Sequence, residues 1–236
     1  MDVEKLIRTQ VALWGAQEQQ ERHQQQQGRG KVGGISYGPY VLISREKGAG
    51  GHTVAELIGA RLGWQVYDRE IVDEIAKQAH VRRELIESLD ENDRGALDGL
   101  LASLFSQGNN DATRYEYQLR QVILALGHRG RVVIVGRGGR FILPGQFGLS
   151  ARLIAPVKTR IQRIAAEQTL AFAAAQTEVE RVDHDRTDYI RRHFHQEIND
   201  QLLHDLIINT EGLSVQAAAE TILTALHHKF SVMPIK

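Results

Sequence analysis

The fold of this chain is decided by residues 40–53, which read Tyr40-Val-Leu-Ile-Ser-Arg-Glu-Lys-Gly-Ala-Gly-Gly-His-Thr53. The first five residues are mostly apolar, which predicts a short buried strand. A glycine-rich turn follows, and then Val54, Leu57, Ile58 and Leu62 recur at the spacing of one helix face. Strand, glycine turn and helix form the layout in which backbone N–H groups bind phosphate. A simple tight turn would need the same glycines, so the turn alone leaves both interpretations open.

Composition narrows the function classes. Lys+Arg and Asp+Glu both number 29, so no global positive charge favours a nucleic-acid partner. The chain has no cysteine, which excludes disulfides, thiol nucleophiles and cysteine-ligated zinc. We find neither a long apolar run nor a signal-peptide pattern. The sequence therefore predicts a cytoplasmic protein without a membrane or nucleic-acid partner.

The order of the elements predicts an α/β fold with a doubly wound parallel sheet of about five strands. After the first strand, further strands are expected at 64–67, 131–135, 151–155 and 206–209, and helices at 70–79, within 85–126, at 157–175 and from Ser214 to about Ala225. The segment at about 69–129 has helical patterns only and forms an insertion. In such sheets ligands bind at the carboxyl ends of the strands. The glycine turn, Asp68 and residues 136–140 are expected at that edge.

The N-terminal segment reads as a separate part, with a boundary at residue 35. Residues 3–27 predict a helix with an apolar stripe and a glutamine-rich end, and residues 28–34 predict a flexible glycine-rich linker. The stripe is expected to pack either on the main domain (residues 36–230) or on a second subunit. The second arrangement would make a homodimer through the N-terminal helix.

Several stretches resemble, in order, the cytidylate kinase-like family, a divergent family of P-loop nucleoside monophosphate kinases. The matching stretches are residues 43–51, 67–71, 133–143, 152–156 with Arg160 and Arg163, 183–194, and 205–214. The resemblance implies a three-layer P-loop kinase fold in which the insertion binds the acceptor and residues 177–200 form a lid. It also implies ATP as donor, Mg2+, and a nucleoside monophosphate as acceptor, with CMP or dCMP as the first expectation.

The resemblance assigns roles to particular residues. The ATP phosphates would lie on Gly48, Ala49, Gly50, Gly51, His52 and Thr53. Asp68, Arg137 and Arg192 would bind the acceptor, and the catalytic groups would be Lys47, Arg137, Arg186 and Arg191. Other interpretations stay open, because Asp68 is also a good helix N-cap and the charges of the lid also suit a solvated, salt-bridged helix face.

Two departures from the family pattern qualify this assignment. The pattern G-x-x-x-x-G-K-[ST] is absent, since Gly51 holds the lysine position and His52 the next one. Lys47, earlier in the loop, is the candidate replacement. After the third strand, Asp-Gly-Arg-Asp is expected, but residues 135–138 read Val-Gly-Arg-Gly without an acid.

These departures keep two other functions open. One is a nucleotide-binding regulatory or scaffold module without useful catalysis, and the other is a kinase of a different small acceptor. The histidines at 184, 193, 195 and 204 lack the spacing of a metal cage, so we predict no metal site made by the protein alone.

Overall fold

The computed structural model describes residues 30–32, 35–89, 91–106 and 114–230. The helix predicted at residues 3–27 lies outside these residues, as does part of the segment in which helices are predicted within 85–126. The described chain divides into two compact units, one built on the main sheet and one mainly helical.

The main sheet has five parallel strands, which confirms the predicted α/β class. Their order across the sheet is β4 (Gln65–Tyr67), β5 (Val132–Val135), β3 (Tyr40–Arg45), β6 (Gly148–Ile154) and β7 (Leu206–Asn209). In the β6–β7 pair, Ala151 lies opposite Leu206. All four residues of β5 are buried, as expected for an apolar strand covered on both faces. In this strand order β3, which leads into the glycine-rich turn, lies in the middle of the sheet.

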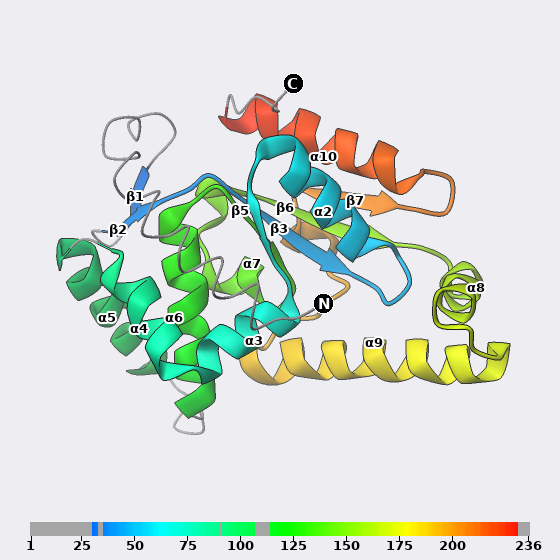
Figure 1. Cartoon of the computed structure of the whole chain (residues 1–236), viewed down its shortest axis with the longest axis horizontal. Helices are drawn as coiled ribbons and strands as arrows, with labels where there is room; N and C mark the ends of the chain where they lie inside the picture. The colour runs from blue at the N-terminus through cyan, green and yellow to red at the C-terminus, as the bar shows by residue number, and fades with distance from the viewer. Residues whose placement is uncertain (1–29, 33–34, 90, 107–113, 231–236) are drawn as a thin grey trace. The chain divides into compact units, whose positions relative to one another are not determined.

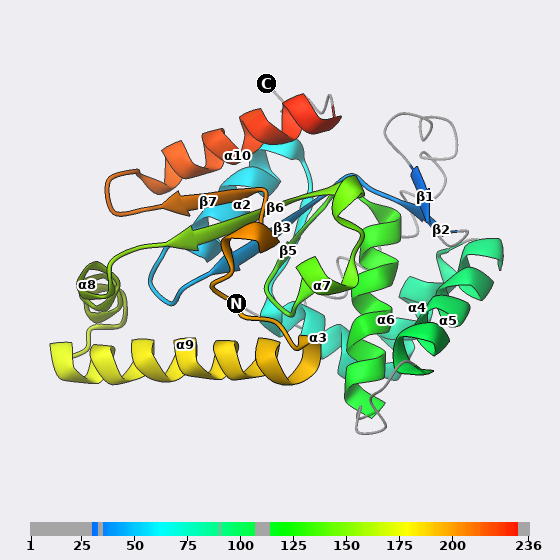
Figure 2. The same cartoon turned by 180° about the vertical axis from the view of Figure 1, so that it is seen from behind.

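Helices cover both faces of this sheet. On one face α2 (Gly51–Leu62) and α10 (Val215–Phe230) lie side by side, and with the strands they enclose the main core, a large cluster of buried apolar residues (Figure 1). On the other side runs the long helix α9 (Phe172–Phe194), which packs against α8 (Val157–Gln168) (Figure 2). Ile161, Ile164, Ala175 and Val179 form the small core between α8 and α9.

The other unit is built around α6 (Arg114–Arg129), which contacts α3 (Arg69–Lys77), α4 (Ala79–Glu87) and α5 (Glu91–Ser106). Two short antiparallel strands, β1 (Gly30–Val32) and β2 (Ile35–Tyr37), belong to it as well. The remaining short elements of the chain are α7 (Gly139–Ile142), η1 (Gly145–Phe147) and η2 (Gln201–Leu203).

Two expectations are corrected. The segment predicted as a flexible linker contains β1, whose residues pair with β2, so backbone pairing overrides the glycine-rich composition there. The single helix expected at 157–175 is two helices. Thr169 adopts a left-handed backbone with a φ of 54° and ends α8, and α9 starts at Phe172, before the expected lid segment. The domain boundary at residue 35 stays a prediction.

The packing of α10 on the sheet gives a stability prediction. Ile222 is fully buried in the main core, so Ile222→Ala removes apolar contacts and leaves a cavity. We expect it to lower the free energy of unfolding by about 2–5 kcal/mol in chemical denaturation. Gln216→Ala, on the exposed side of the same helix, is the matched control and should change it little. Equal effects of the two changes would contradict the described packing.

Candidate active site

The loop between β3 and α2, residues 46–50, is called here the glycine loop. It turns through Gly48 and Gly50, whose φ angles of 81° and 77° lie in the left-handed region that glycine adopts without strain. Gly50 caps α2 without a side-chain hydrogen bond. The first N–H groups of a helix have no partner inside the helix. This helix end is therefore suited to hold an anion.

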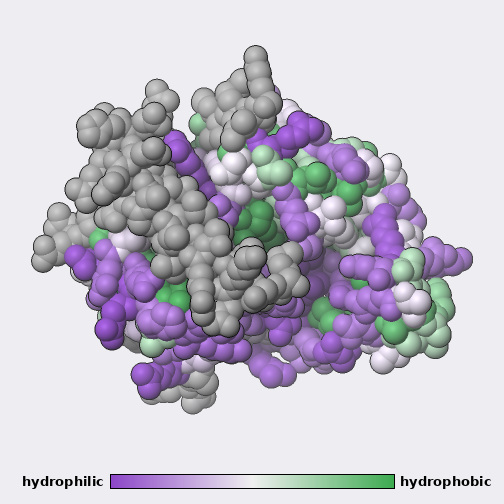
Figure 3. All heavy atoms as spheres, in the orientation of Figure 1, coloured by the Kyte–Doolittle hydropathy of each residue, from purple (hydrophilic) through white to green (hydrophobic). Residues whose placement is uncertain are grey.

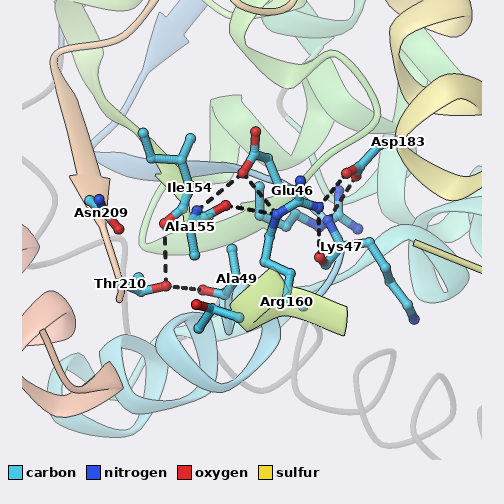
Figure 4. Close-up of polar contacts among 12 residues, drawn as sticks. Glu46, Lys47, Ala49, Ile154, Ala155, Arg160, Asp183, Asn209 and Thr210 are labelled. Carbon is cyan, nitrogen blue, oxygen red and sulfur yellow. Dashed lines mark hydrogen bonds and ion pairs between the residues drawn. The ribbon is translucent and has the colours of Figure 1, made fainter. Parts of the chain in front are cut away.

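A buried arginine holds the glycine loop in place (Figure 4). Arg160, from the first turn of α8, is only 7% exposed. Its Nη1 donates to the carbonyl of Lys47 at 3.1 Å and to the carboxylate of Asp183, while its Nε lies 3.2 Å from Oε2 of Glu46. The same Glu46 oxygen accepts the N–H of Ala155 at 3.1 Å. Arg160 thus joins the loop, the end of β6 and the helix α9.

Asp183 carries this linkage into α9. Its Oδ1 accepts the backbone N–H of Lys47 at 2.8 Å, and its other oxygen pairs with Arg160. Arg186, one turn further along α9, donates to the carbonyl of Arg45 at 3.1 Å. The predicted lid helix is therefore fastened to the loop by its own side chains, and it brings Arg186 to the end of β3.

Thr210, directly after β7, closes the loop from the other side. Its fully buried hydroxyl donates to the carbonyls of Ala49 at 3.2 Å and Ile154 at 3.3 Å (Figure 4). Arg163 donates to the hydroxyl of Thr210 at 3.0 Å and to its carbonyl at 2.6 Å. Three strand ends, β3, β6 and β7, are therefore tied to one loop.

Beside β3, the chain leaves β5 through three successive left-handed residues: Gly136, Arg137 and Gly138. Their φ angles are 83°, 51° and 67°. For a residue with a side chain this conformation costs about 1–2 kcal/mol. The guanidinium carbon of Arg137 lies 5.7 Å from the ring centre of Tyr189 on α9, in cation–π geometry. The strained residue is thus the one that carries the positive charge.

The structure does not bring all predicted residues together. Arg191 and Arg192 are exposed, and their side chains pair with Glu197 and Asp188. Figure 3 shows α9 as mostly hydrophilic, with a hydrophobic group at the α8–α9 turn, where Leu170 and Phe172 are exposed. The C-terminal end of α9, with Arg191 and Arg192, is therefore a salt-bridged helix face, which was the alternative interpretation of the lid charges.

Three further predicted residues have other surroundings. His52 is exposed and lies 3.2 Å from the carboxylate of Glu56, one turn along α2, and Thr53 is exposed as well. Asp68 is the N-cap of α3, with its Oδ1 accepting the N–H groups of Glu70 and Ile71 at 3.0 Å. It belongs to the helical unit, and its predicted contact with an acceptor stays a prediction.

Sequence reasoning missed the residues that organise the loop: Glu46, Arg160 in its buried role, Asp183 and Thr210. One signal was available for Arg160, since an arginine in the first turn after a strand that ends in proline lies next to neighbouring strand ends. For Asp183 and Thr210 no signal existed, because their partners are 136 and 161 residues away in the chain.

Within the described ranges, no group of three or more His, Cys, Asp or Glu side chains is arranged to hold a metal ion. Among the histidines, His204 is distinctive. Its Nδ1 lies 2.8 Å from the hydroxyl of Ser150, near the start of β6. Burial, with the positive charges of Arg152 and Arg140, lowers the pKa of His204 to about 4.

These features define an α/β protein with the fold of the P-loop kinases. The chain belongs to the cytidylate kinase-like family, whose model matches residues 40–212. The matched segment covers the glycine loop, the end of β5 and the whole of α9.

The chain is also similar to several solved structures. An uncharacterised protein from Eubacterium ventriosum is 20% identical with a TM-score of 0.55, over 79% of this chain and 97% of that one. TT1252 from Thermus thermophilus has 18% identity and a TM-score of 0.46, covering 80% and 98%. A shikimate kinase from Bacteroides thetaiotaomicron has 12% identity and a TM-score of 0.42, over 80% of this chain and 96% of that one. No curated protein matches the sequence. No helix in the described part of the chain has the length and apolarity to cross a membrane.

The buried ion pairs give a stability prediction. Arg160→Leu leaves the carboxylates of Glu46 and Asp183 without their cation in a poorly hydrated place. We expect the free energy of unfolding to fall by about 3–5 kcal/mol in urea denaturation. Arg181→Leu is the control, since Arg181 also bridges two carboxylates but is exposed, and it should have little effect. A small effect of Arg160→Leu would mean that the network does not hold the loop.

His204 gives a prediction of pH dependence. In the unfolded chain a histidine binds a proton below pH about 6.5, whereas folded His204 binds it only near pH 4. The unfolded state therefore holds more protons between these values, and stability is lost as the pH falls through this window. We expect His204→Gln to flatten the fall in stability between pH 6.5 and 4, measured by denaturation at each pH. The exposed His184→Gln should leave the slope unchanged, and an unchanged slope in His204→Gln would contradict the assignment.

Proposed function

We propose that this protein is a phosphotransferase that moves the terminal phosphate of ATP to a nucleoside monophosphate, with CMP or dCMP as the first acceptor to test. One observation carries the proposal. A loop with two left-handed glycines leaves the central strand and enters α2 without a side-chain cap, and arginines of α8 and α9 donate to carbonyls of the loop and of the end of β3. Phosphoryl transfer depends mainly on positioning and on charge stabilisation, which such an arrangement supplies.

In this proposal the donor phosphates bind at the glycine loop and the start of α2, with backbone N–H groups of residues 51–53 as donors. Arg186 lies beside the end of β3 and would stabilise charge on the transferred group. Arg137 would hold the acceptor phosphate with its planar fork, and Asp68 the acceptor sugar or base. Lys47, Arg191 and Arg192 would join only if their side chains turned towards the phosphates on nucleotide binding.

ATP in such reactions carries Mg2+, which would neutralise charge on the phosphate oxygens. The two carboxylates next to the glycine loop, Glu46 and Asp183, are both bound to Arg160. The position after Gly51 holds His52, where a hydroxyl ligand would be expected. The described residues therefore do not fit a magnesium site of the usual P-loop kind, and we derive no step through the ion.

A second function, a nucleotide-binding regulatory module, is favoured by Gly51 at the lysine position and by the lack of acids in residues 135–138. A kinase for another small acceptor is the third alternative. Turnover separates the regulatory module from both kinase functions, and the acceptor that supports turnover separates the kinases from each other.

The test begins with thermal shift of the full chain by ATP, CMP, dCMP, UMP and AMP, each with and without Mg2+, because a ligand that binds the folded state raises its midpoint. ADP formation is then measured with each monophosphate. We expect stabilisation by ATP and by one monophosphate, with ADP formed only when both are present. Stabilisation without turnover would favour the regulatory module, and no response to any nucleotide would overturn the proposal.

Arg137 provides the mutational test. Arg137→Gly removes the guanidinium and also relieves the left-handed strain at this position. We expect kcat/KM to fall about 100-fold, the usual effect of losing one stabilising donor, with thermal stability unchanged or slightly raised. Arg181→Ala, an exposed arginine of α9, is the control and should keep its activity. Full activity of Arg137→Gly would remove this residue from the proposed site.

A further inference from the structure

Arg45, the last residue of β3, passes over the first residue of α2. A Cβ atom built on Gly51 would lie 2.7 Å from both Cβ and Cγ of Arg45 and 3.4 Å from its Cδ. Non-bonded carbon atoms do not approach so closely, so any side chain at position 51 would collide with the stem of Arg45. The backbone of Gly51 lies outside the left-handed region, so its conformation does not require glycine. The stem of Arg45 is the reason that position 51 has no side chain.

The charged end of the same side chain reaches the neighbouring strand. A Cβ atom built on Gly136 would lie 2.4 Å from Nη1 of Arg45 and 3.3 Å from its Cζ. Gly136 directly follows β5, which is adjacent to β3 in the sheet. The guanidinium therefore lies against the backbone at the end of β5, next to Arg137. Two glycines, Gly51 at the start of α2 and Gly136 directly after β5, make room for one arginine.

This path bears on the missing lysine. In the usual pattern a lysine at the position of Gly51 brings a positive charge to the phosphates. Here that position has no side chain, the stem of Arg45 lies where the Cβ of such a lysine would be, and the guanidinium of Arg45 lies at Gly136. A guanidinium offers five N–H donors in a planar fork that matches phosphate oxygens, so it can supply the charge that the lysine would supply.

We propose that Arg45 is a phosphate-binding residue that takes the place of the P-loop lysine, that Gly51 is a glycine because the stem of Arg45 passes it, and that Gly136, whose left-handed φ of 83° already suits glycine, leaves room for the guanidinium. The inference rests on the proposed function, since it names a binding group of the same site. It also makes a reciprocal claim about the chain. The atoms nearest to a Cβ at position 51 all belong to Arg45, its own Cβ included, so a side chain at position 51 should become acceptable when Arg45 is replaced by glycine.

The experiment measures the affinity of the full chain for ATP and for inorganic tripolyphosphate by calorimetry, with circular dichroism as the check of folding. Arg45→Met keeps most of the stem and removes the charge. It should weaken binding of both ligands about 10- to 100-fold, the usual loss for a hydrogen bond to a charged group. Arg61→Ala, on the same helix as Gly51 and paired with Glu220, is the control and should bind as the unmodified chain does.

The decisive variant moves the charge. Arg45→Gly alone removes the stem with its Cβ and should bind weakly, and Arg45→Gly combined with Gly51→Lys should regain at least about tenfold of the lost affinity. A residue that only braced the two strands would not be replaced by a lysine on the helix, so this rescue separates phosphate binding from a structural role. The double variant also gives the answer if Arg45→Met does not fold.

Three results would overturn the inference, and they bear differently on the proposed function. If the unmodified chain binds ATP and tripolyphosphate while folded Arg45→Met binds them equally well, Arg45 is not a phosphate ligand and the proposed function stands. Loss of binding in Arg45→Gly without rescue in the double variant also rejects the replacement of lysine. If the unmodified chain binds neither ligand, the proposed function fails and this inference fails with it.

Discussion

The site depends on one buried cation. Arg160 contacts the glycine loop through the carbonyl of Lys47, the end of β6 through Ala155 and Glu46, and α9 through Asp183. A buried guanidinium is stable only when its donors are met by oxygens and its charge by carboxylates, so these contacts are mutually required. The residues that contact Arg160 come from elements that are distant in the chain. The hydrogen bonds and ion pairs of Arg160 therefore also fix where the loop lies relative to α9. The geometry of the loop follows from the electrostatics of a residue outside it.

Charge also distinguishes the two ends of the loop. On the side of α8 the carboxylates of Glu46 and Asp183 form ion pairs with Arg160. On the side of β5, Arg45 and Arg137 adjoin a segment without an acidic residue, and Arg186 donates to the carbonyl of Arg45. Positive groups near the first backbone N–H groups of a helix attract an anion. The loss of the two expected acids after β5 and the presence of Arg45 at that place are therefore consistent with each other.

The sequence allowed the fold class, the central strand and the glycine loop to be predicted, because alternation of apolar strands with helices is a local pattern repeated along the chain. The break at Thr169 escaped prediction, since the apolar spacing continues across it and only the left-handed backbone separates α8 from α9. The pairing of β1 with β2 escaped for a similar reason, because a glycine-rich composition does not reveal backbone hydrogen bonds. The contacts of Arg160, Asp183 and Thr210 depend on which strand ends meet, and this is a property of the whole sheet. Asp68 showed the limit of assignment by motif, since its carboxylate caps α3 as the simpler interpretation required.

The glycines that first drew attention to the loop are each accounted for by a neighbour within the protein. A Cβ atom on Gly48 would lie 2.7 Å from the carbonyl oxygen of Arg160, one on Gly50 would lie 2.8 Å from Val215, and one on Gly51 would meet the stem of Arg45. The glycine pattern therefore records how tightly the loop packs on α8, α10 and β3, and a phosphate is not needed to explain it. The functional information lies instead in the side chains that this packing admits. Of these side chains Arg45 is the most informative, because it lies where a Cβ atom of residue 51 or residue 136 would lie, and both of these residues are glycines.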